Sequence, residues 1–222
     1  MKKVVKGLII KDLYNLEKYK VSFLINFVIF AGLVFLSPMI LNIFPTMIIT
    51  YMIMIALSSF SFDEVSKSEK YILSLPITKK DVVLSKYILV NLLTIISLII
   101  AIILSIVIKY IIKSDIQIIE IIVSGLTGLV VIMSFAFIQI PSIYKFGYEK
   151  GRINGVMITS IIAICITGII FLISKIPVVF NNINIIENII EKTFFIIVSI
   201  VYIVINYVSY KVSCKFYNKR EV

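Results

Sequence analysis

Six long apolar runs, separated by short charged segments, constrain what this chain can fold into more than any other feature of its sequence. The runs cover residues 21–40, 45–62, 87–108, 118–140, 153–174 and 193–210. Each is close to the roughly 20 residues that a helix needs to cross a hydrocarbon core about 30 Å thick. The sequence therefore predicts an all-α integral membrane protein, a bundle of six transmembrane helices in a single domain over residues 1–222. Pro141 follows the fourth run and is expected to end its helix.

The composition excludes a soluble globular protein. Hydrophobic residues make up 60% of the chain and charged residues 15%, and the mean hydropathy is +1.10. A soluble domain carries about 25% charged residues. Too little polar surface is left to coat a globule in water.

The lysines and arginines are distributed unevenly between the two sides of the predicted bundle. Of the 22, 18 lie before the first run, after the last run, or in the second and fourth connections. Basic residues mark the cytoplasmic side of a membrane protein. We therefore expect a multi-pass protein of the cell membrane with both termini and residues 63–86 in the cytoplasm. Because these basic residues flank spans, the net charge of +10 is expected to attract membrane lipids rather than nucleic acid.

The N-terminal segment, residues 1–20, has an amphipathic pattern. At 100° per residue, one stripe falls within an arc of about 80°, and it consists of Val5, Ile9, Leu13 and Leu16. Lys11 and Lys18 point away from this stripe. The pattern predicts a helix lying in the cytoplasmic interface before the chain enters the membrane. The alternative is an ordinary basic tail next to the first span.

A charged excursion at residues 63–86 interrupts the apolar pattern. Ser66 and Glu69 have the spacing of a capping box, and Thr78 and Asp81 repeat that spacing. Pro76 offers no N–H and disfavours helical geometry at the residue before it. We expect a short helix over about 67–74, a corner at the proline, and a second helix from about residue 79 that continues into the third run.

Apolar side chains stand among the lysines of this excursion. They are either a docking surface for another protein or an anchor on lipid headgroups, with the lysines reaching toward phosphate. The residues concerned are Tyr71, Ile72, Leu73 and Leu75.

The segment FSFDEVSKSEKYILSLPITKKDVVLSKYILVNLL, residues 60–93, resembles the hallmark segment of small six-span permeases of type-2 ABC exporters, the ABC-2 transporter permease family. The similar features are an aromatic-Ser-aromatic-Asp-Glu stretch at 60–64, a Ser-Leu-Pro corner at 74–76, a lysine-rich turn at 78–80 and Ser-Lys-Tyr at 85–87.

This resemblance implies an elbow helix within residues 1–20, a cytoplasmic coupling loop at 63–86, and an external connection at 175–192 that could hold a short helix. It also implies that the chain forms the translocation path for an amphipathic or hydrophobic substrate such as a peptide, lipid or drug. A separate cytoplasmic ABC ATPase and a second permease, identical or different, would be its partners. The implied ATPase-coupling residues are Ser66, Glu69, Tyr71, Ile72, Leu73, Leu75, Pro76, Thr78, Lys79, Lys80 and Asp81.

Polar residues inside the predicted spans are few. Among the amides, Asn26, Asn91, Gln139 and Asn206 either line a translocation path or hydrogen-bond between helices. Such a bond contributes about 0.6 to 2 kcal/mol. Ser124 with Gly128, and Gly155 with Thr159, have the small-xxx-small spacing of close helix contacts, or reflect ordinary residue usage in membrane helices.

Motifs for nucleotide, metal and catalysis are missing from the sequence. The eight glycines form no G-x-x-x-x-G-K-[ST] loop, so ATP and Mg are expected in the partner ATPase and no cofactor in this chain. The predicted spans contain one acid, Glu120, and no Asp, Lys or Arg, whereas ion-coupled carriers use intramembrane charges. The chain has no histidine, and Cys165 and Cys214 lie at different levels, so we expect neither a metal site nor catalytic residues.

Two other functions fit the same pattern. A stand-alone membrane protein that confers immunity to antimicrobial peptides would work without an ATPase. A substrate-capture subunit of an energy-coupling-factor importer would bind a small ligand tightly by itself, although its usual A-x-x-x-A contact is absent from the first run. A membrane enzyme fits least, because no paired acids or activated nucleophile stand in or beside a span.

Overall fold

The computed structural model of the chain describes residues 3–74, 76–174 and 183–219, and every regular element in these ranges is a helix. The elements are α1 (Lys3–Leu16), the 3-10 helix η1 (Glu17–Tyr19), α2 (Lys20–Leu36), the 3-10 helix η2 (Pro38–Asn42), α3 (Phe44–Val65), α4 (Ser68–Ser74), α5 (Lys79–Ile112), α6 (Ile118–Phe146), α7 (Tyr148–Ser174) and α9 (Ile183–Lys219). The all-α prediction is confirmed for these residues.

Four helices of the described part are long and apolar enough to cross a membrane, judged by length and composition. They are the continuous helix Val4–Leu36, which joins α1 to α2, and the helices α3, α5 and α6. The predicted runs at 153–174 and 193–210 lie in α7 and α9, where part of the side chains falls outside the described residues. The described residues thus make a multi-pass membrane protein with four candidate spans. The described part of the predicted external connection, residues 183–192, belongs to α9 and forms no separate short helix.

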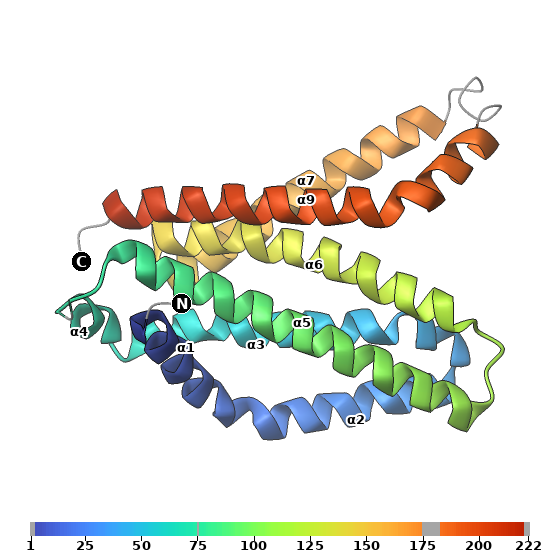
Figure 1. Cartoon of the computed structure of the whole chain (residues 1–222), viewed down its shortest axis with the longest axis horizontal. Coiled ribbons are helices and arrows are strands. Elements are labelled where there is room, and N and C mark those ends of the chain that lie inside the picture. Colours follow the sequence, from blue (N-terminus) through green and yellow to red (C-terminus); the bar gives the residue numbers. More distant parts are fainter. Residues whose placement is uncertain (1–2, 75, 175–182, 220–222) are drawn as a thin grey trace.

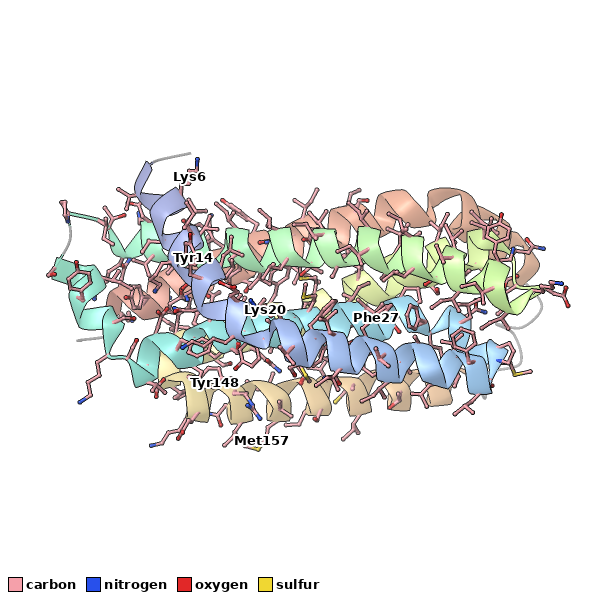
Figure 2. All side chains as sticks on the ribbon, turned by 90° about the horizontal axis from the view of Figure 1, so that it is seen from below. Lys6, Tyr14, Lys20, Phe27, Tyr148 and Met157 are labelled. Carbon is pink, nitrogen blue, oxygen red and sulfur yellow. The ribbon has the colours of Figure 1, made fainter. Side chains whose placement is uncertain are left out.

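The long helices run side by side along the long axis of the molecule (Figure 1). The two chain ends and α4 lie at the same end of this bundle, called here the α4 end. In Figure 2, α1, marked by Lys6 and Tyr14, runs obliquely to α2, marked by Phe27. The predicted N-terminal helix is therefore present and changes direction at η1 before α2 joins the bundle.

Two prolines change the predicted helix ends. α2 ends at Leu36 rather than at residue 40, because Pro38 has no N–H to continue the helix and instead begins η2. Pro141 does not end the fourth helix, and α6 continues through it to Phe146.

The helix tolerates Pro141 because another helix supplies the missing donor. A proline at this position leaves the carbonyl oxygen of Phe137, four residues earlier, without its helical hydrogen bond. The hydroxyl of Ser209 in α9 donates to that oxygen at 2.5 Å. Neighbouring helices commonly satisfy backbone groups freed by proline in membrane bundles, so this bond also ties α6 to α9.

Glycines let the helices approach closely around α3 and α6. A Cβ at Gly128 would overlap Cγ2 of Thr46 in α3, and a Cβ at Gly155 would lie 2.8 Å from Cγ of Gln139. Both positions belong to the small-residue spacings in the sequence, and the close-contact prediction is confirmed for these two glycines. Lipid tails are as apolar as the helix surfaces, so this close packing contributes much of the association.

Candidate functional site

Four charged side chains from three helices meet in the interior at the α4 end. Nζ of Lys86 in α5 lies 2.9 Å from Oδ2 of Asp12 in α1 and 2.6 Å from Oδ2 of Asp63 in α3. Nζ of Lys11 lies 2.5 Å from Oδ1 of Asp63 and 3.2 Å from Oδ1 of Asp12. We call Lys11, Asp12, Asp63 and Lys86 the charge cluster; it joins α1, α3 and α5.

Asp12 and Lys86 of the charge cluster are buried, whereas Asp63 is 16% and Lys11 32% exposed. The side chains of Asp12 and Lys86 are 1% and 4% exposed. Lys86 also donates to the carbonyl oxygen and to Oγ of Ser59, both at 3.2 Å, and its Nζ lies 5.0 Å from the centroid of the Phe60 ring. Desolvation costs several kcal/mol per ion, and here two carboxylates offset two ammonium groups. Loss of any member leaves an uncompensated buried charge, so the cluster holds the three helices in one arrangement.

Asp63 also connects the charge cluster to α4. The hydroxyl of Ser68, the first residue of α4, donates to Oδ1 of Asp63 at 2.9 Å. Lys67, between α3 and α4, has a φ of 50° and turns the chain sharply. Ile72 in α4 is 5% exposed and packs into the hydrophobic core. A displacement of α4 would therefore act on Asp63 and, through Lys86, on α1 and α5.

A small cavity of about 50 Å³ adjoins the charge cluster. Asp63, Lys86 and Tyr144 are among its lining residues. The Tyr144 hydroxyl is buried and has no hydrogen-bond partner within the described ranges. A cavity of this size admits a water molecule, which requires polar partners such as these. The interior beside α3, α5 and α6 thus contains polar groups at the same height in the bundle as the ion pairs.

The next acid along the chain, Glu64, connects α3 to α7. Its Oε2 accepts a hydrogen bond from the N–H of Tyr148 at 2.5 Å. The first N–H groups of a helix lack partners within it and interact favourably with a carboxylate. Gly147 precedes Tyr148 with a φ of 85°, a conformation that suits glycine. Consecutive acids at the end of α3 therefore contact three different helices beyond α4.

The second predicted capping box is confirmed. The N–H of Asp81 donates to Oγ1 of Thr78 at 3.2 Å, and the N–H of Thr78 donates to Oδ2 of Asp81 at 3.3 Å. α5 begins at Lys79 and runs on to Ile112, as the cap spacing predicts. Nζ of Lys79 donates to the carbonyl oxygen of Tyr217 at 3.3 Å, so this lysine fastens the start of α5 to α9.

The first predicted capping box is wrong for Ser66. This residue ends α3, and its hydroxyl donates back to the carbonyl oxygen of Phe62 at 2.6 Å. A serine hydroxyl that bonds the carbonyl four residues earlier is no longer available to cap a following helix. α4 begins at Ser68, one residue later than expected. The side chain of Glu69 lies outside the described residues.

The predicted docking residues of the loop separate into buried and exposed ones. Ile72 is buried, so its place in a docking surface is wrong, because its face of α4 packs on the core. Tyr71 is 70% exposed, and Pro76 and Lys80 are exposed as well. The Leu73 side chain and residue Leu75 lie outside the described part of the chain.

The predicted stripe of α1 is mostly correct. Val5, Ile9 and Leu16 are buried against α3 and α5. Leu13 is 37% exposed and lines an apolar pocket together with Leu16 and Phe23, so its place in the stripe stays a prediction. The expectation that Lys11 points away is wrong, because its ion pair with Asp63 draws the long side chain around the helix to the packed side.

The four amides predicted to line a path do not form one polar surface. Nδ2 of Asn206 in α9 donates to Oδ1 of Asn91 in α5 at 3.0 Å, and the Tyr202 hydroxyl donates to the same oxygen. Gln139 packs against Gly155 elsewhere in the bundle, and Asn26 bonds the carbonyl oxygen of Ser22 in its own helix. Only Asn91 and Asn206 meet, as an interhelical hydrogen bond.

Sequence reasoning missed the charge cluster. Lys86 belongs to the basic residues expected at the headgroups, yet it is buried. Periodicity within one helix carries no information on which acids of other helices face it. One signal was available: Lys86 and Asp63 stand directly beside apolar runs, where an unpaired charge would be costly. The described residues include no group of acids, cysteines or histidines that could hold a metal ion.

Comparison with known proteins identifies the family of the chain. The family described as ABC-2 family transporter protein matches residues 7–218. No curated protein and no solved structure matches the sequence. The match covers nearly the whole chain, including most of α1, residues 63–86 and the charge cluster, and agrees with the resemblance in residues 60–93. The chain therefore belongs to the ABC-2 family of transporter membrane proteins, as a non-catalytic transport subunit.

Proposed function

We propose that this protein is the permease subunit of an ATP-driven exporter. It spans the cell membrane six times, with both termini and α4 in the cytoplasm. Two permease subunits work with two cytoplasmic ATPase subunits, which bind the ATP and Mg. The family and the position of 18 of the 22 basic residues on one side support this arrangement.

The charge cluster is the observation that carries the proposal. Asp63 bonds both Ser68 of α4 and Lys86 of α5, and Lys86 bonds Asp12 of α1. A movement of α4 driven by the ATPase is passed to α1, α3 and α5 as one unit, because breaking the cluster would strand buried charges. The helix bundles of the two permease subunits then move as rigid bodies, and the transporter changes between inward-facing and outward-facing states.

The transported molecule is amphipathic or hydrophobic, such as a peptide, lipid or drug. The spans present apolar side chains, and the charged groups of the described interior gather at the α4 end, where they pair with one another. Such a surface favours an apolar substrate over an ion or a sugar.

The ATPase contacts the exposed part of the coupling loop. Tyr71 is 70% exposed on α4, and exposed Pro76 follows it in the loop. Tyrosines of this kind are common anchors of protein interfaces. Ile72, on the buried face of α4, serves the core and not the contact.

The test is co-purification of an ATPase with the tagged protein from its native cells in mild detergent. Tyr71→Asp is compared with Tyr110→Asp, because Tyr110 is 68% exposed at the other end of α5. Loss of an interface anchor weakens binding by about thirtyfold, so we expect Tyr71→Asp to lose the ATPase and Tyr110→Asp to retain it. Equal recovery in both variants would contradict the docking site. If the native protein brings down no ATPase, the protein acts alone, as an immunity protein or a substrate-capture subunit would before assembly.

A further inference from the structure

A membrane-level groove lies between α5 and α9. Its volume is about 690 Å³, and its lining is mainly apolar, with Leu84, Ile96, Ile203 and Tyr207 among the contributors. The hydrogen-bonded pair of Asn91 and Asn206 also lines it. The charge cluster, α4 and the proposed ATPase contact make no use of this groove.

The length of the groove matches one leaflet of a bilayer. On α5 the lining runs from Leu84 to Ile96, which is about 18 Å at 1.5 Å per residue. Half of a hydrocarbon core is about 15 Å thick. The groove begins near the α4 end, where α5 starts and α9 finishes (Figure 1). It therefore extends over the leaflet next to the α4 end and is long enough for an acyl chain of that leaflet.

On each of the two helices, a lysine lies one turn beyond the groove lining, on the side of the α4 end. Lys80 is exposed and lies one helical turn before Leu84 on α5. Lys211 lies one turn after Tyr207 on α9, with its Nζ 4.5 Å from the centroid of the Tyr207 ring. The nearest acid on α5, Asp81, is buried in the capping box and does not offset these charges at the surface. The mouth of the groove is thus cationic and its body apolar.

We propose that this groove binds an anionic phospholipid from the leaflet at the α4 end, with an acyl chain along α5 and α9 and the phosphate between Lys80 and Lys211. The charge pattern favours this occupant, because an apolar helix of a second copy would leave the two lysines without a counter-charge. The inference rests on the membrane placement in the proposed function and is independent of the ATPase and of transport.

The test is lipid retention by the purified full-length protein in native mass spectrometry, with phosphatidylglycerol and phosphatidylcholine as separate probes. A lysine near an anionic surface contributes about fivefold in affinity, so Lys80→Gln with Lys211→Gln should weaken phosphatidylglycerol binding by about 25-fold. Lys6→Gln with Lys150→Gln removes the same charge from exposed positions off the groove and should retain it.

A second pair of variants fills the groove instead of removing charge. Ile203→Trp adds bulk at a groove residue that is 64% exposed, and Val208→Trp adds it at a 53% exposed residue of α9 outside the groove. We expect lipid loss in Ile203→Trp alone. Equal phosphatidylglycerol retention in all variants would overturn the proposal. It would also be overturned if Ile203→Trp dissociated a dimer of the protein without changing lipid retention. ATPase recovery is measured separately, so failure of the exporter proposal leaves this result readable.

Discussion

At the scale of single residues, Lys86 has the largest role in the described structure. Its ammonium group contacts both Asp12 and Asp63 and is almost fully enclosed. The ion pair between Lys20 and Glu17 has a similar length, 2.8 Å, but its side chains are 68% and 58% exposed. Pairs in water contribute about 0 to 1 kcal/mol, whereas removal of one partner from a buried pair costs about 3 to 5 kcal/mol. Burial, rather than distance, therefore decides which lysine matters.

Lys86→Met should destabilise the protein by about 3 to 5 kcal/mol, because Lys11 alone then faces two carboxylates and one buried carboxylate is left without a counter-charge. Lys20→Met is the control and should change stability by less than about 1 kcal/mol. Thermal unfolding in detergent measures both. The double variant Lys86→Met, Asp12→Asn keeps the pair of Lys11 with Asp63 and should recover part of the loss. Equal effects of the two single variants would mean that water reaches the charge cluster.

At the scale of helices, the sequence predicts elements better than their contacts. The start of α5 follows from Thr78 and Asp81, and the end of α4 from Pro76, because caps and prolines act locally. The turn at Lys67 and the role of Ser66 were not predictable. A serine hydroxyl can bond either a carbonyl oxygen of the preceding helix or an N–H of the following one, and the path of the chain decides which of these it bonds. Contacts between helices depend on residues that are far apart in the sequence. The charge cluster therefore could not be predicted from local patterns.

Glycine substitutions grade the helix contacts. A Cβ at Gly151 would overlap the backbone of α6 at Ile143 and lie 2.6 Å from the carbonyl oxygen of Ser142, while at Gly128 it would meet the side chain of Thr46. Backbone cannot rotate away, so Gly151→Ala should destabilise more than Gly128→Ala, which should cost about 1 to 3 kcal/mol. Gly32→Ala meets nothing within 4 Å and is the control, neutral or stabilising. The temperatures of thermal unfolding rank the three variants. A lower unfolding temperature for Gly32→Ala than for the other two would contradict these helix contacts.

At the scale of the whole molecule, helix length places α4 and its flanking residues outside the hydrocarbon. α5 has 34 residues and α9 has 37, about 51 and 55 Å at 1.5 Å per residue. A hydrocarbon core is about 30 Å thick. Both helices must therefore project from the membrane. α5 begins at Lys79, at the α4 end, where α1 crosses the bundle, so the projecting part includes that end.

This placement is tested with two matched cysteine variants, Lys67→Cys and Lys113→Cys, in a Cys165→Ser, Cys214→Ser background. Lys67 and Lys113 are both exposed, both follow helix ends, and have φ values of 50° and 55°. They stand at opposite ends of the bundle, so an impermeant maleimide should label Lys113→Cys in intact cells at least tenfold faster than Lys67→Cys. Permeabilisation should equalise the two rates, because the sites are alike in conformation. The reverse preference in intact cells would place α4 outside the cell, where no cytoplasmic ATPase could reach it.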